Sequence, residues 1–253
     1  MIPKKLMVVA GERSGDLHAS RIIASLKKLS PSTEVFGVGG ERMLRSGAEI
    51  LTDITGLAVV GLAEVVRNYP TFRRLFRRLV EVARHRQPDA ALLVDYPGFN
   101  LRLARVLKSL GIKVVYFVSP QVWAWGRNRV KRMRKCVDRM IVVFDFEVPI
   151  YRRAGIDVVF VGHPLAEVLI PTMSRQEFRR KAGILPEAKV VAILPGSRLH
   201  EVARHVPIMA EAAEIIRRKV AQAQFLLPAA TEELAGECRR LLRRHRVSAP
   251  ITI

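Results

Sequence analysis

The sequence has few cysteines, no long apolar run and a shortage of acidic residues. Its two cysteines, Cys136 and Cys238, lie far apart in the 253-residue chain, with no spacing around them typical of metal ligands. This argues against a zinc site or a disulfide framework and suits a reducing cytoplasm. No apolar stretch approaches the roughly 20 residues that cross a bilayer, so we expect any membrane contact to be peripheral. The apolar run at 6–10 is also too short for a signal peptide.

Acidic residues are outnumbered by basic ones, 23 against 43, which gives a formal net charge of +20. Such a surplus indicates a polyanionic partner: nucleic acid, a phosphorylated metabolite or an anionic membrane surface. The alternative is a generic basic surface in an arginine-rich proteome. A nucleic-acid-binding module is disfavoured, because the sequence has neither a recognised nucleic-acid motif nor a basic stretch interleaved with aromatic residues.

Short apolar runs alternate along the chain with amphipathic stretches of helical spacing. This pattern is typical of a parallel sheet covered by helices on both faces, so it predicts an α/β fold. The expected strands are 6–10, 35–38, 90–95, 114–118, 139–143, 158–161, 190–194 and 225–227. The expected helices are 17–29, 70–85, 99–110, 127–135, 201–220 and 232–244.

A break between 162 and 174 separates two such series, which predicts two domains, 1–165 and 166–253. Within the break, His163 either contacts a ligand or belongs to a hinge turn. Ser174, followed three residues later by Glu177, is expected to cap a new helix. The second series stops inside an expected strand at 251–253, so we expect the second domain to be incomplete.

Residues 11–16, Gly-Glu-Arg-Ser-Gly-Asp, directly follow the first expected strand and open a helix. Ligands of doubly wound sheets bind at this position. Glycines let the backbone approach a ligand, and free N–H groups at the start of a helix attract anions. The spacing matches neither a P-loop nor a dinucleotide fingerprint. A tight turn with Ser14 or Asp16 as the helix cap is an equal alternative.

Two further segments follow expected strands. Asp95 ends the strand 90–95, where its carboxylate can take a proton from an attacking hydroxyl group or merely cap the next helix. Residues 119–125 follow the strand 114–118 and contain both tryptophans, Trp123 and Trp125. Two such rings suit stacking on a sugar or an acyl chain, and a packed corner under the sheet explains them equally well.

The strongest local signal is Leu-Pro-Gly-Ser-Arg at 194–198, which ends the first strand of the second series. Gly196 and Ser197 offer backbone access and a hydroxyl donor, and Arg198 offers a bidentate fork for a phosphate. Glu201, one turn later, can cap the helix or hold Arg198. Together these residues predict a pyrophosphate cradle.

The segment 65–83 carries apolar side chains at helical spacing, flanked by arginines. Such a helix can lie on an anionic membrane with its apolar face inserted. The alternative is a helix that faces the protein core and keeps its basic side in solvent, and the segment alone favours this alternative.

Seven segments, taken in order, resemble lipid-A-disaccharide synthases along nearly the whole chain. They are 10–16, 37–40 with Met43 and Gly47, Gly61 with 64–65, 95–100, 119–125, 160–164 and 194–198. No single segment is decisive, but seven in the family's order are specific. The resemblance implies a glycosyltransferase B fold, in which two Rossmann-like domains face each other across a cleft. The family continues beyond Ile253, and many of its members carry an aspartate where Gly98 stands.

The resemblance also implies an activity. A 2,3-diacylglucosamine unit would move, with inversion, from its UDP derivative to 2,3-diacylglucosamine 1-phosphate, giving the β-1,6-linked lipid A disaccharide 1-phosphate of lipopolysaccharide biosynthesis. No metal or cofactor is expected, because cationic side chains and helix N-termini can stabilise the leaving pyrophosphate. The enzyme would be cytoplasmic and peripheral on the inner face of the cytoplasmic membrane of a Gram-negative bacterium. The resemblance admits a homodimer and implies no nucleic-acid partner.

Carried onto this sequence, the resemblance makes Asp95 the candidate catalytic base. The substrate-binding candidates are Gly11, Glu12, Ser14, Gly15, Asp16, Asn100, Gln121, Trp123, Gly196, Ser197, Arg198 and Glu201. The membrane-contact candidates are Val66, Tyr69, Phe72, Arg73, Phe76 and Arg77, so the resemblance favours membrane contact for this helix. Competing hypotheses are another UDP-sugar enzyme of this fold, such as a 2-epimerase or a peptidoglycan glycosyltransferase, and a basic nucleic-acid-binding module.

Overall fold

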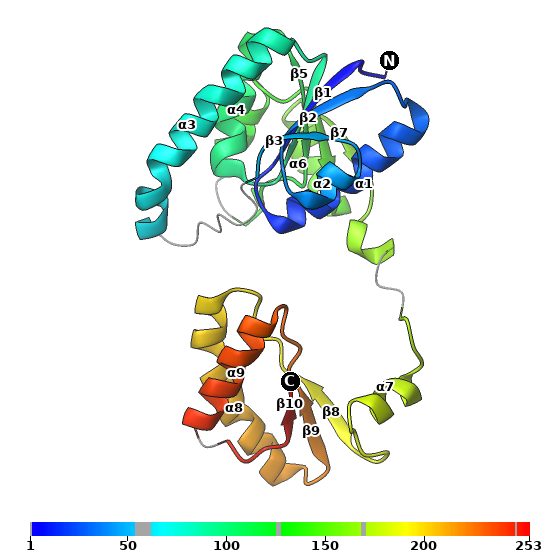
Figure 1. The fold of residues 1–253 in the computed structure, drawn as a ribbon, viewed down its shortest axis with the longest axis vertical. Helices are drawn as coiled ribbons and strands as arrows, with labels where there is room; N and C mark the ends of the chain where they lie inside the picture. The colour runs from blue at the N-terminus through cyan, green and yellow to red at the C-terminus, as the bar shows by residue number, and fades with distance from the viewer. Residues whose placement is uncertain (1, 54–61, 125–127, 168–170, 246) are drawn as a thin grey trace. The chain divides into compact units, whose positions relative to one another are not determined.

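The structure, a computed structural model, describes residues 2–53, 62–124, 128–167, 171–245 and 247–253, without the side chains of 62–68, Asn128 and Glu167. The chain forms two compact units, Met1–Leu169 and Ile170–Ile253 (Figure 1). The boundary between them falls a few residues after the one expected at 165/166. In the described part of the chain, no helix is both long and apolar enough to cross a membrane.

The first unit is built on a parallel seven-stranded sheet with the order β3-β2-β1-β4-β5-β6-β7. Its strands are β1 Lys5–Ala10, β2 Glu34–Val38, β3 Glu49–Thr52, β4 Ala90–Val94, β5 Lys113–Phe117, β6 Arg139–Val142 and β7 Asp157–Phe160. The strand order reverses between β1 and β4, so the loops after these two strands part to opposite sides. Ligands of doubly wound sheets bind at this switch point.

Helices cover both faces of this sheet. The first face carries α1 Arg13–Leu29 and α2 Glu41–Arg45, and the second carries α3 Leu62–Arg86, α4 Pro97–Ser109, α5 Asn128–Met133 and α6 Val148–Arg153. Short 3₁₀ turns lie at η1 Asp145–Glu147 and η2 Pro164–Glu167. Figure 1 shows α3 and α4 on one side of the sheet and α1 and α2 on the other.

The apolar run of β4 explains why this sheet needs two layers of helices. Leu92 and Val94 pack in the core cluster under α1 and α2, whereas Ala91 and Leu93 pack in the cluster under α3 and α4. Successive side chains of a strand point to opposite faces, so a continuous apolar run is buried only when both faces are covered. The predicted parallel α/β architecture is confirmed.

Helix α3 begins at Leu62, well before the predicted start at residue 70, and contains Pro70 in its interior. Phe72 and Phe76 pack against the core, each with its ring centroid about 6 Å from that of Phe99, at 6.2 and 5.8 Å. Arg73 and Arg77 are exposed. The expectation that Phe72 and Phe76 face a membrane is therefore corrected, because both rings cover the core instead.

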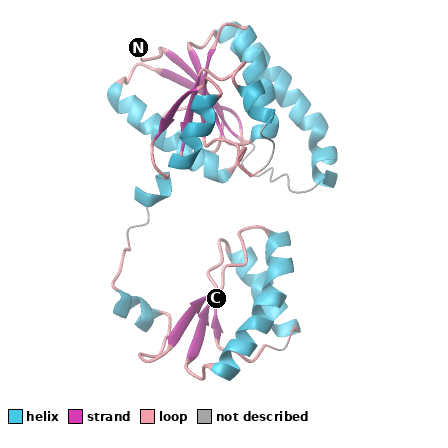
Figure 2. Ribbon diagram, turned by 180° about the vertical axis from the view of Figure 1, so that it is seen from behind, coloured by secondary structure: helices cyan, strands magenta, loops and turns pink. Residues whose placement is uncertain are grey.

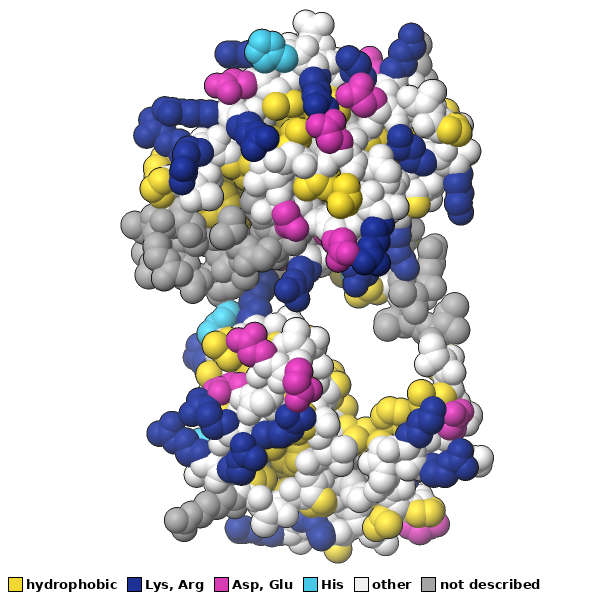
Figure 3. Space-filling view, viewed as in Figure 1, with side chains coloured by type: hydrophobic (Ala, Val, Ile, Leu, Met, Phe, Trp, Pro, Cys, Tyr) yellow, Lys and Arg dark blue, Asp and Glu magenta, His cyan; other side chains and the backbone are white. Residues whose placement is uncertain are grey.

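Four membrane-contact candidates remain: the exposed Arg73 and Arg77, together with Tyr69 and Val66. The side chain of Tyr69 is exposed, at 55%. The side chain of Val66 lies outside the described residues. Lys and Arg side chains are scattered over the visible faces of both units instead of forming one patch (Figure 3). The visible charge therefore does not single out the continuous basic stripe that a nucleic-acid interface usually has.

The second unit has a parallel three-stranded sheet with the order β10-β9-β8. Its elements are α7 Arg175–Lys181, β8 Lys189–Ala192, α8 Leu199–Lys219, β9 Ala223–Leu226, α9 Glu232–Arg244 and β10 Ile251–Thr252. Figure 2 shows α8 and α9 packed along this small sheet, where they bury Val206, Phe225 and Cys238. The Ser174 hydroxyl accepts a hydrogen bond from the Glu177 N–H at 3.2 Å, which confirms the predicted helix cap.

Candidate active site

The loop after β1 touches the loop after β4. A Cβ atom added at Gly11 would lie 2.9 Å from the ring of Tyr96, closer than real Cβ contacts come. Gly11 therefore lets the Tyr96 ring lie against the backbone of the first loop. Glu12 is the N-cap of α1 and makes no side-chain cap, so neither Ser14 nor Asp16 caps this helix. The capping alternative weighed for these two residues is wrong.

Asp16 holds a neighbouring loop in place. Its carboxylate is buried and accepts hydrogen bonds from the backbone N–H groups of Gly40 at 2.8 Å, Met43 at 3.1 Å and Arg42 at 3.2 Å. These N–H groups belong to the start of α2, where a negative charge is favourable. Gly15 is buried as well, and Ser14 is exposed. The Asp16 carboxylate thus shapes this region, and its expected contact with a substrate stays a prediction.

Asp95 directly follows β4, at the switch point, and adopts a left-handed backbone conformation. Its φ is 48°, and that of Tyr96 is 49°. Two successive non-glycine residues in this conformation cost roughly 1–3 kcal/mol each and persist only when the surroundings hold them. The Asp95 N–H donates to the Phe117 carbonyl at 2.9 Å, and the Asp95 carbonyl accepts from the Tyr116 hydroxyl at 2.6 Å.

The Asp95 side chain is suited to accepting a proton. Burial raises the pKa of its carboxyl group, the Glu12 carboxylate raises it further, and the Tyr96 backbone N–H opposes the shift. A general base works best when its pKa lies near the working pH, so a raised value improves an aspartate as a base. The two loops at the switch point thus combine a candidate base with the charge that tunes it.

The side chain of Asn100 holds the backbone of Asp95 through hydrogen bonds. Its side chain is fully buried, and Nδ2 donates to the carbonyls of Val94 at 3.1 Å and Asp95 at 2.8 Å. Its Oδ1 has no hydrogen-bond partner among the described residues. Its expected role in substrate binding stays a prediction, and its contacts in this structure hold the backbone of Asp95.

Exposed aromatic rings lie beyond the carboxyl ends of β5 and β6. Trp123 is 44% exposed and meets Phe146 edge-on at 5.5 Å, and Phe146 stacks on Phe144 at 5.4 Å. Gln121 is exposed beside them, and Trp125 lies outside the described residues. Such rings suit the apolar face of a sugar or an acyl chain. Phe144 and Phe146 were not predicted from the sequence, although they too lie in the segment after a strand, β6.

A buried polar group lies under the loop that carries Trp123. The Ser119 hydroxyl is hydrogen-bonded to the Glu147 carboxylate, and the Tyr151 hydroxyl donates to the Pro120 carbonyl at 3.3 Å. Burial raises the pKa of Glu147, and it raises the pKa of Tyr151 to about 12. These contacts fix the start of the loop, so its aromatic end projects from a rigid base.

His163 lies against the same aromatic group, with its ring 5.7 Å from that of Phe144. Its Nδ1 accepts a hydrogen bond from the Leu165 N–H at 3.2 Å, and Arg21 donates to the Pro164 carbonyl at 3.2 Å. The turn is thus attached to α1. Burial lowers the pKa of the nearby His18, and the charges of His163 and Arg21 lower it further.

In the second unit, Glu201 occupies the predicted pyrophosphate cradle. Its Oε2 accepts hydrogen bonds from the N–H groups of Ser197 at 3.0 Å and Arg198 at 3.1 Å, and its Oε1 lies 3.4 Å from Nη1 of Arg198. Both roles weighed for Glu201, helix cap and partner of Arg198, are therefore present. Gly196 has a φ of 120°, and a Cβ there would lie 2.4 Å from Oε2. This glycine lets the loop wrap around a carboxylate, which stands where an anionic ligand would bind.

The candidate residues thus form two groups. Asp95, Glu12 and the exposed aromatic rings belong to the first unit, and the residues from Gly196 to Glu201 belong to the second. Within the described ranges, no cluster of three His, Cys, Asp or Glu side chains could hold a metal ion.

A family model for lipid-A-disaccharide synthetase matches residues 6–249. The chain belongs to this family. It is 44% identical over 248 residues to the lipid-A-disaccharide synthase of Geobacter sulfurreducens, a match that covers 98% of this chain and 65% of that protein. The enzyme of the same name from Coxiella burnetii is 41% identical over 230 residues, covering 91% of this chain and 61% of the relative. The chain therefore spans less than two thirds of the length of these two synthases.

Solved structures of UDP-sugar enzymes share the fold of this synthetase-family chain. UDP-GlcNAc 2-epimerase from Neisseria meningitidis, bound to UDP-GlcNAc, aligns with a TM-score of 0.62 at 13% identity, over 98% of this chain and 71% of that chain. The UDP-GlcNAc 2-epimerase from Methanocaldococcus jannaschii, in complex with UDP-GlcNAc and UDP, aligns with a TM-score of 0.62 at 14% identity. The alignment covers 98% of this chain and 72% of that chain. These likenesses show the glycosyltransferase B-like fold expected from the sequence, and at this identity they show the fold alone.

Proposed function

We propose that this chain carries the base-bearing part of a transferase that builds the lipid A disaccharide. The transferred group is 2,3-diacylglucosamine from its UDP derivative, and the acceptor is 2,3-diacylglucosamine 1-phosphate. The observation that carries the proposal is Asp95: in a chain of this family, a half-buried carboxyl group of raised pKa stands at the switch point of the sheet. Family membership supplies the reaction, and Asp95 supplies the chemistry for its first step.

In the proposed reaction, Asp95 takes the proton from the attacking hydroxyl group of the acceptor. That oxygen forms a bond to the anomeric carbon from the side opposite the UDP group, so the configuration inverts as UDP leaves. The leaving pyrophosphate gains negative charge, which Arg198 and the backbone N–H groups of Ser197 and Arg198 would stabilise. These N–H groups are bonded to Glu201, so its carboxylate would move aside for the pyrophosphate.

The aromatic rings around Trp123 would take the apolar parts of the substrates. Trp123, Phe144 and Phe146 together expose apolar surface at the carboxyl edge of the sheet. A diacylated sugar presents both a ring face and acyl chains, and aromatic side chains pack well on either. Gln121, exposed beside them, is the candidate hydrogen-bonding partner for a substrate hydroxyl.

Contact with the inner face of the cytoplasmic membrane remains part of the proposal, in a narrower form. Tyr69, Arg73 and Arg77 are exposed on α3 and combine an interfacial aromatic ring with positive charge. Such residues favour an anionic membrane surface without deep insertion. The homodimer that the resemblance admits stays a prediction.

The proposal is tested in a chimaera in which this chain replaces the 248 matched residues of the Geobacter sulfurreducens relative. We expect UDP release from acylated UDP-glucosamine only when acylated glucosamine 1-phosphate is also present. The intact relative serves as the positive control, and the isolated chain is assayed in parallel. A well-folded chimaera without acceptor-dependent UDP release would contradict the proposal, and interconversion of UDP-GlcNAc with its 2-epimer would support the epimerase instead.

A further inference from the structure

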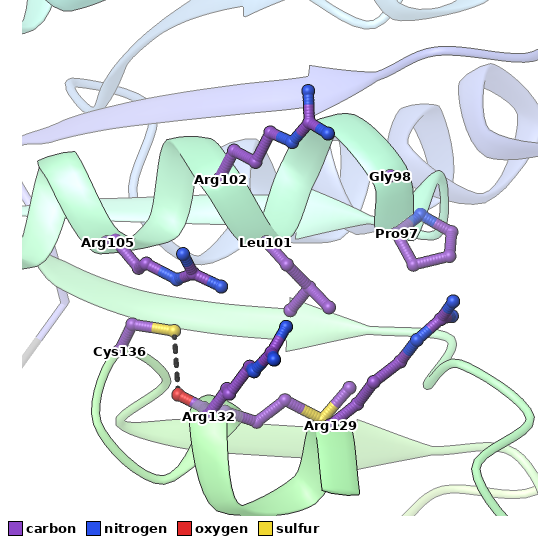
Figure 4. Close-up of a pocket in the computed structure, with 9 residues that line it drawn as sticks. Pro97, Gly98, Leu101, Arg102, Arg105, Arg129, Arg132 and Cys136 are labelled. Carbon is purple, nitrogen blue, oxygen red and sulfur yellow. Dashed lines mark hydrogen bonds between the residues drawn. The ribbon is translucent and has the colours of Figure 1, made fainter. Parts of the chain in front are cut away.

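A groove between α4 and α5 collects arginine side chains that the proposed transfer does not use. It has a volume of about 230 Å³, and its walls carry Arg102 and Arg105 from α4 and Arg129 and Arg132 from α5. We call it the arginine groove. Figure 4 shows the guanidinium groups of Arg105 and Arg132 pointing toward each other across it and Arg129 reaching toward Pro97, whereas Arg102 points away at the rim.

No carboxylate of the described residues neutralises the positive charge in the arginine groove. None of its four guanidinium groups makes a hydrogen bond or ion pair with a carboxylate in the described part of the chain. The sequence has no acidic residue between Asp95 and Asp138, so the adjacent segments have none to offer either.

Two lysines near the arginine groove, unlike its arginines, are paired with a carboxylate of the described residues. Lys108, one turn beyond Arg105, is paired with Asp138, and Lys113 lies 3.8 Å from the same carboxylate. The single acid of this region therefore serves two lysines outside the groove. The arginines that line the concave surface are left with positive charge that a ligand can neutralise.

The floor of the arginine groove is apolar. Leu101 lines it, and Met133 and Cys136 are buried beneath it, at 0% and 2% exposure. Charges beside an apolar wall are screened less than charges surrounded by water. A ligand held here would place its charge among the guanidinium groups and its uncharged part against this floor.

The arrangement of the cations favours one class of anion. A guanidinium group binds a carboxylate or a phosphate through two parallel N–H···O bonds. One guanidinium group therefore engages both oxygens of a carboxylate. A phosphoryl group has three peripheral oxygens and up to two charges, so it can be shared by several arginines. Arg105, Arg129 and Arg132 approach from both walls, which suits the phosphoryl group better.

We propose that the arginine groove is a binding site for a phosphoryl group. This inference goes beyond the proposed transfer reaction, because it assigns a ligand class to residues that take no part in it. Two sources share the chemistry: a soluble phosphorylated molecule, and the headgroup of an anionic phospholipid. The site stands or falls on binding alone, so it can be tested without donor or acceptor sugar.

The first experiment titrates the purified chain with inorganic phosphate and with pyrophosphate in a chloride buffer by calorimetry. The double variant Arg105→Gln/Arg132→Gln is expected to weaken binding at least tenfold. Lys131→Gln/Arg134→Gln is the matched control, because it removes the same charge from exposed positions of the same region outside the groove. Circular dichroism and the melting temperature verify that both variants fold.

A second variant keeps the arginines and changes the groove from its other end. Gly98 lines the groove, and a Cβ added there would meet no atom within 4 Å, so a larger side chain fits without displacing the fold. Gly98→Asp places a carboxylate among the guanidinium groups and is expected to lower phosphate affinity severalfold. Gly98→Asn, of the same shape without the charge, is expected to lower it less.

The second arm separates the two sources with vesicles of phosphatidylcholine, with and without phosphatidylglycerol. If the unaltered chain and the control variant bind phosphate or pyrophosphate and the groove variants do not, the ligand is a soluble phosphorylated molecule. Groove-dependent binding to the phosphatidylglycerol vesicles, with no measurable phosphate binding, identifies a lipid headgroup. The proposal is overturned if the Arg105/Arg132 and Lys131/Arg134 variants lose the same affinity. It is also overturned if the unaltered chain binds neither phosphate, nor pyrophosphate, nor the phosphatidylglycerol vesicles.

Discussion

The candidate residues of the first unit and those of the second are held in opposite ways. Around Asp95 the backbone is left-handed at two successive residues, and the buried side chains of Asn100 and Tyr116 hold its carbonyl. Around Arg198 the loop is exposed, and the N–H groups of Ser197 and Arg198 donate to the carboxylate of Glu201, which lies in the first turn of α8. The difference teaches that the surrounding structure holds the candidate base in place without a ligand, whereas a phosphate at the proposed cradle would have to displace the Glu201 carboxylate.

Substitution of Asp95 gives the largest expected effect. Asp95→Asn should slow UDP release by the chimaera about 10²–10⁴-fold, the usual contribution of a general base. The control is Asp157→Asn, an exposed aspartate paired with Arg139 at the start of β7. UDP release by Asp95→Asn within threefold of the unaltered chimaera would remove Asp95 from the mechanism.

Substitution in the loop around Arg198 should reduce activity less than substitution of Asp95. Arg198→Ala is expected to lower kcat/KM for the UDP-sugar about 10- to 100-fold, because a hydrogen bond to a charged group contributes roughly 1.5–3 kcal/mol. Arg198→Lys should recover only part of this, since the planar fork is lost. Arg204→Ala, on the exposed side of α8, is the matched control. Equal kinetics for the Arg198 and Arg204 variants would show that the cradle lies elsewhere.

The support beneath Asp95 can be removed without touching its carboxylate. Asn100→Ala removes the amide that donates to the carbonyls of Val94 and Asp95, which should lower the free energy of unfolding by about 1–3 kcal/mol. In a chain of this size the melting temperature should fall by roughly 2–10 °C.

Ser109→Ala is the control for this variant, because it deletes an exposed hydrogen bond to Val106 on the same helix. Differential scanning calorimetry of both variants distinguishes a buried from an exposed contact. Equal melting temperatures would mean that the left-handed turn does not depend on Asn100.

The smallest effect concerns pH. The Glu12 carboxylate helps raise the pKa of Asp95, so Glu12→Gln should lower that pKa. A base must be deprotonated to act, so the rate falls as the pH drops through its pKa. The acidic limb of the profile of kcat/KM against pH should therefore move to lower pH in the variant. Glu41→Gln, at the exposed start of α2, should leave the limb in place.

Raising the pKa of a carboxyl group in the folded state also sets the direction of a stability change. The contribution of Asp95 to stability is present at low pH and is lost as the pH rises through its folded-state pKa. Asp95→Asn should accordingly stabilise the isolated chain more at neutral pH than at a pH below the ordinary pKa of an aspartate, which thermal melts over that range measure.

Much of the fold follows from apolar patterning, and the exceptions have physical causes. Helix α9 has the predicted bounds, because its amphipathic period is strong and Thr231 caps it. The short elements α2, β3 and α6 were not predicted, since four to six residues carry too little periodic signal. The predicted helix starts at Pro70, whereas α3 starts at Leu62 and contains Pro70 in its interior.

The candidate site was predictable in position but not in contacts. Parallel strands that alternate with helices place Asp95 at a carboxyl edge, so its location follows from the pattern. The partners of Asp16 lie at Gly40 and Met43, and the ring against Gly11 comes from Tyr96. Such contacts join residues far apart in the sequence, and no local spacing signals them. The buried amide of Asn100, in contrast, contacts carbonyls only five and six residues away.

The contact between Gly11 and the Tyr96 ring has a consequence for redesign of this protein. Any side chain introduced at position 11 pushes on Tyr96, and Tyr96 shares its left-handed turn with Asp95. A change made to alter what one loop recognises is therefore transmitted to the neighbouring residue that would perform the chemistry. Directed evolution of the specificity of this protein should therefore vary residues 11–16 and 95–100 together.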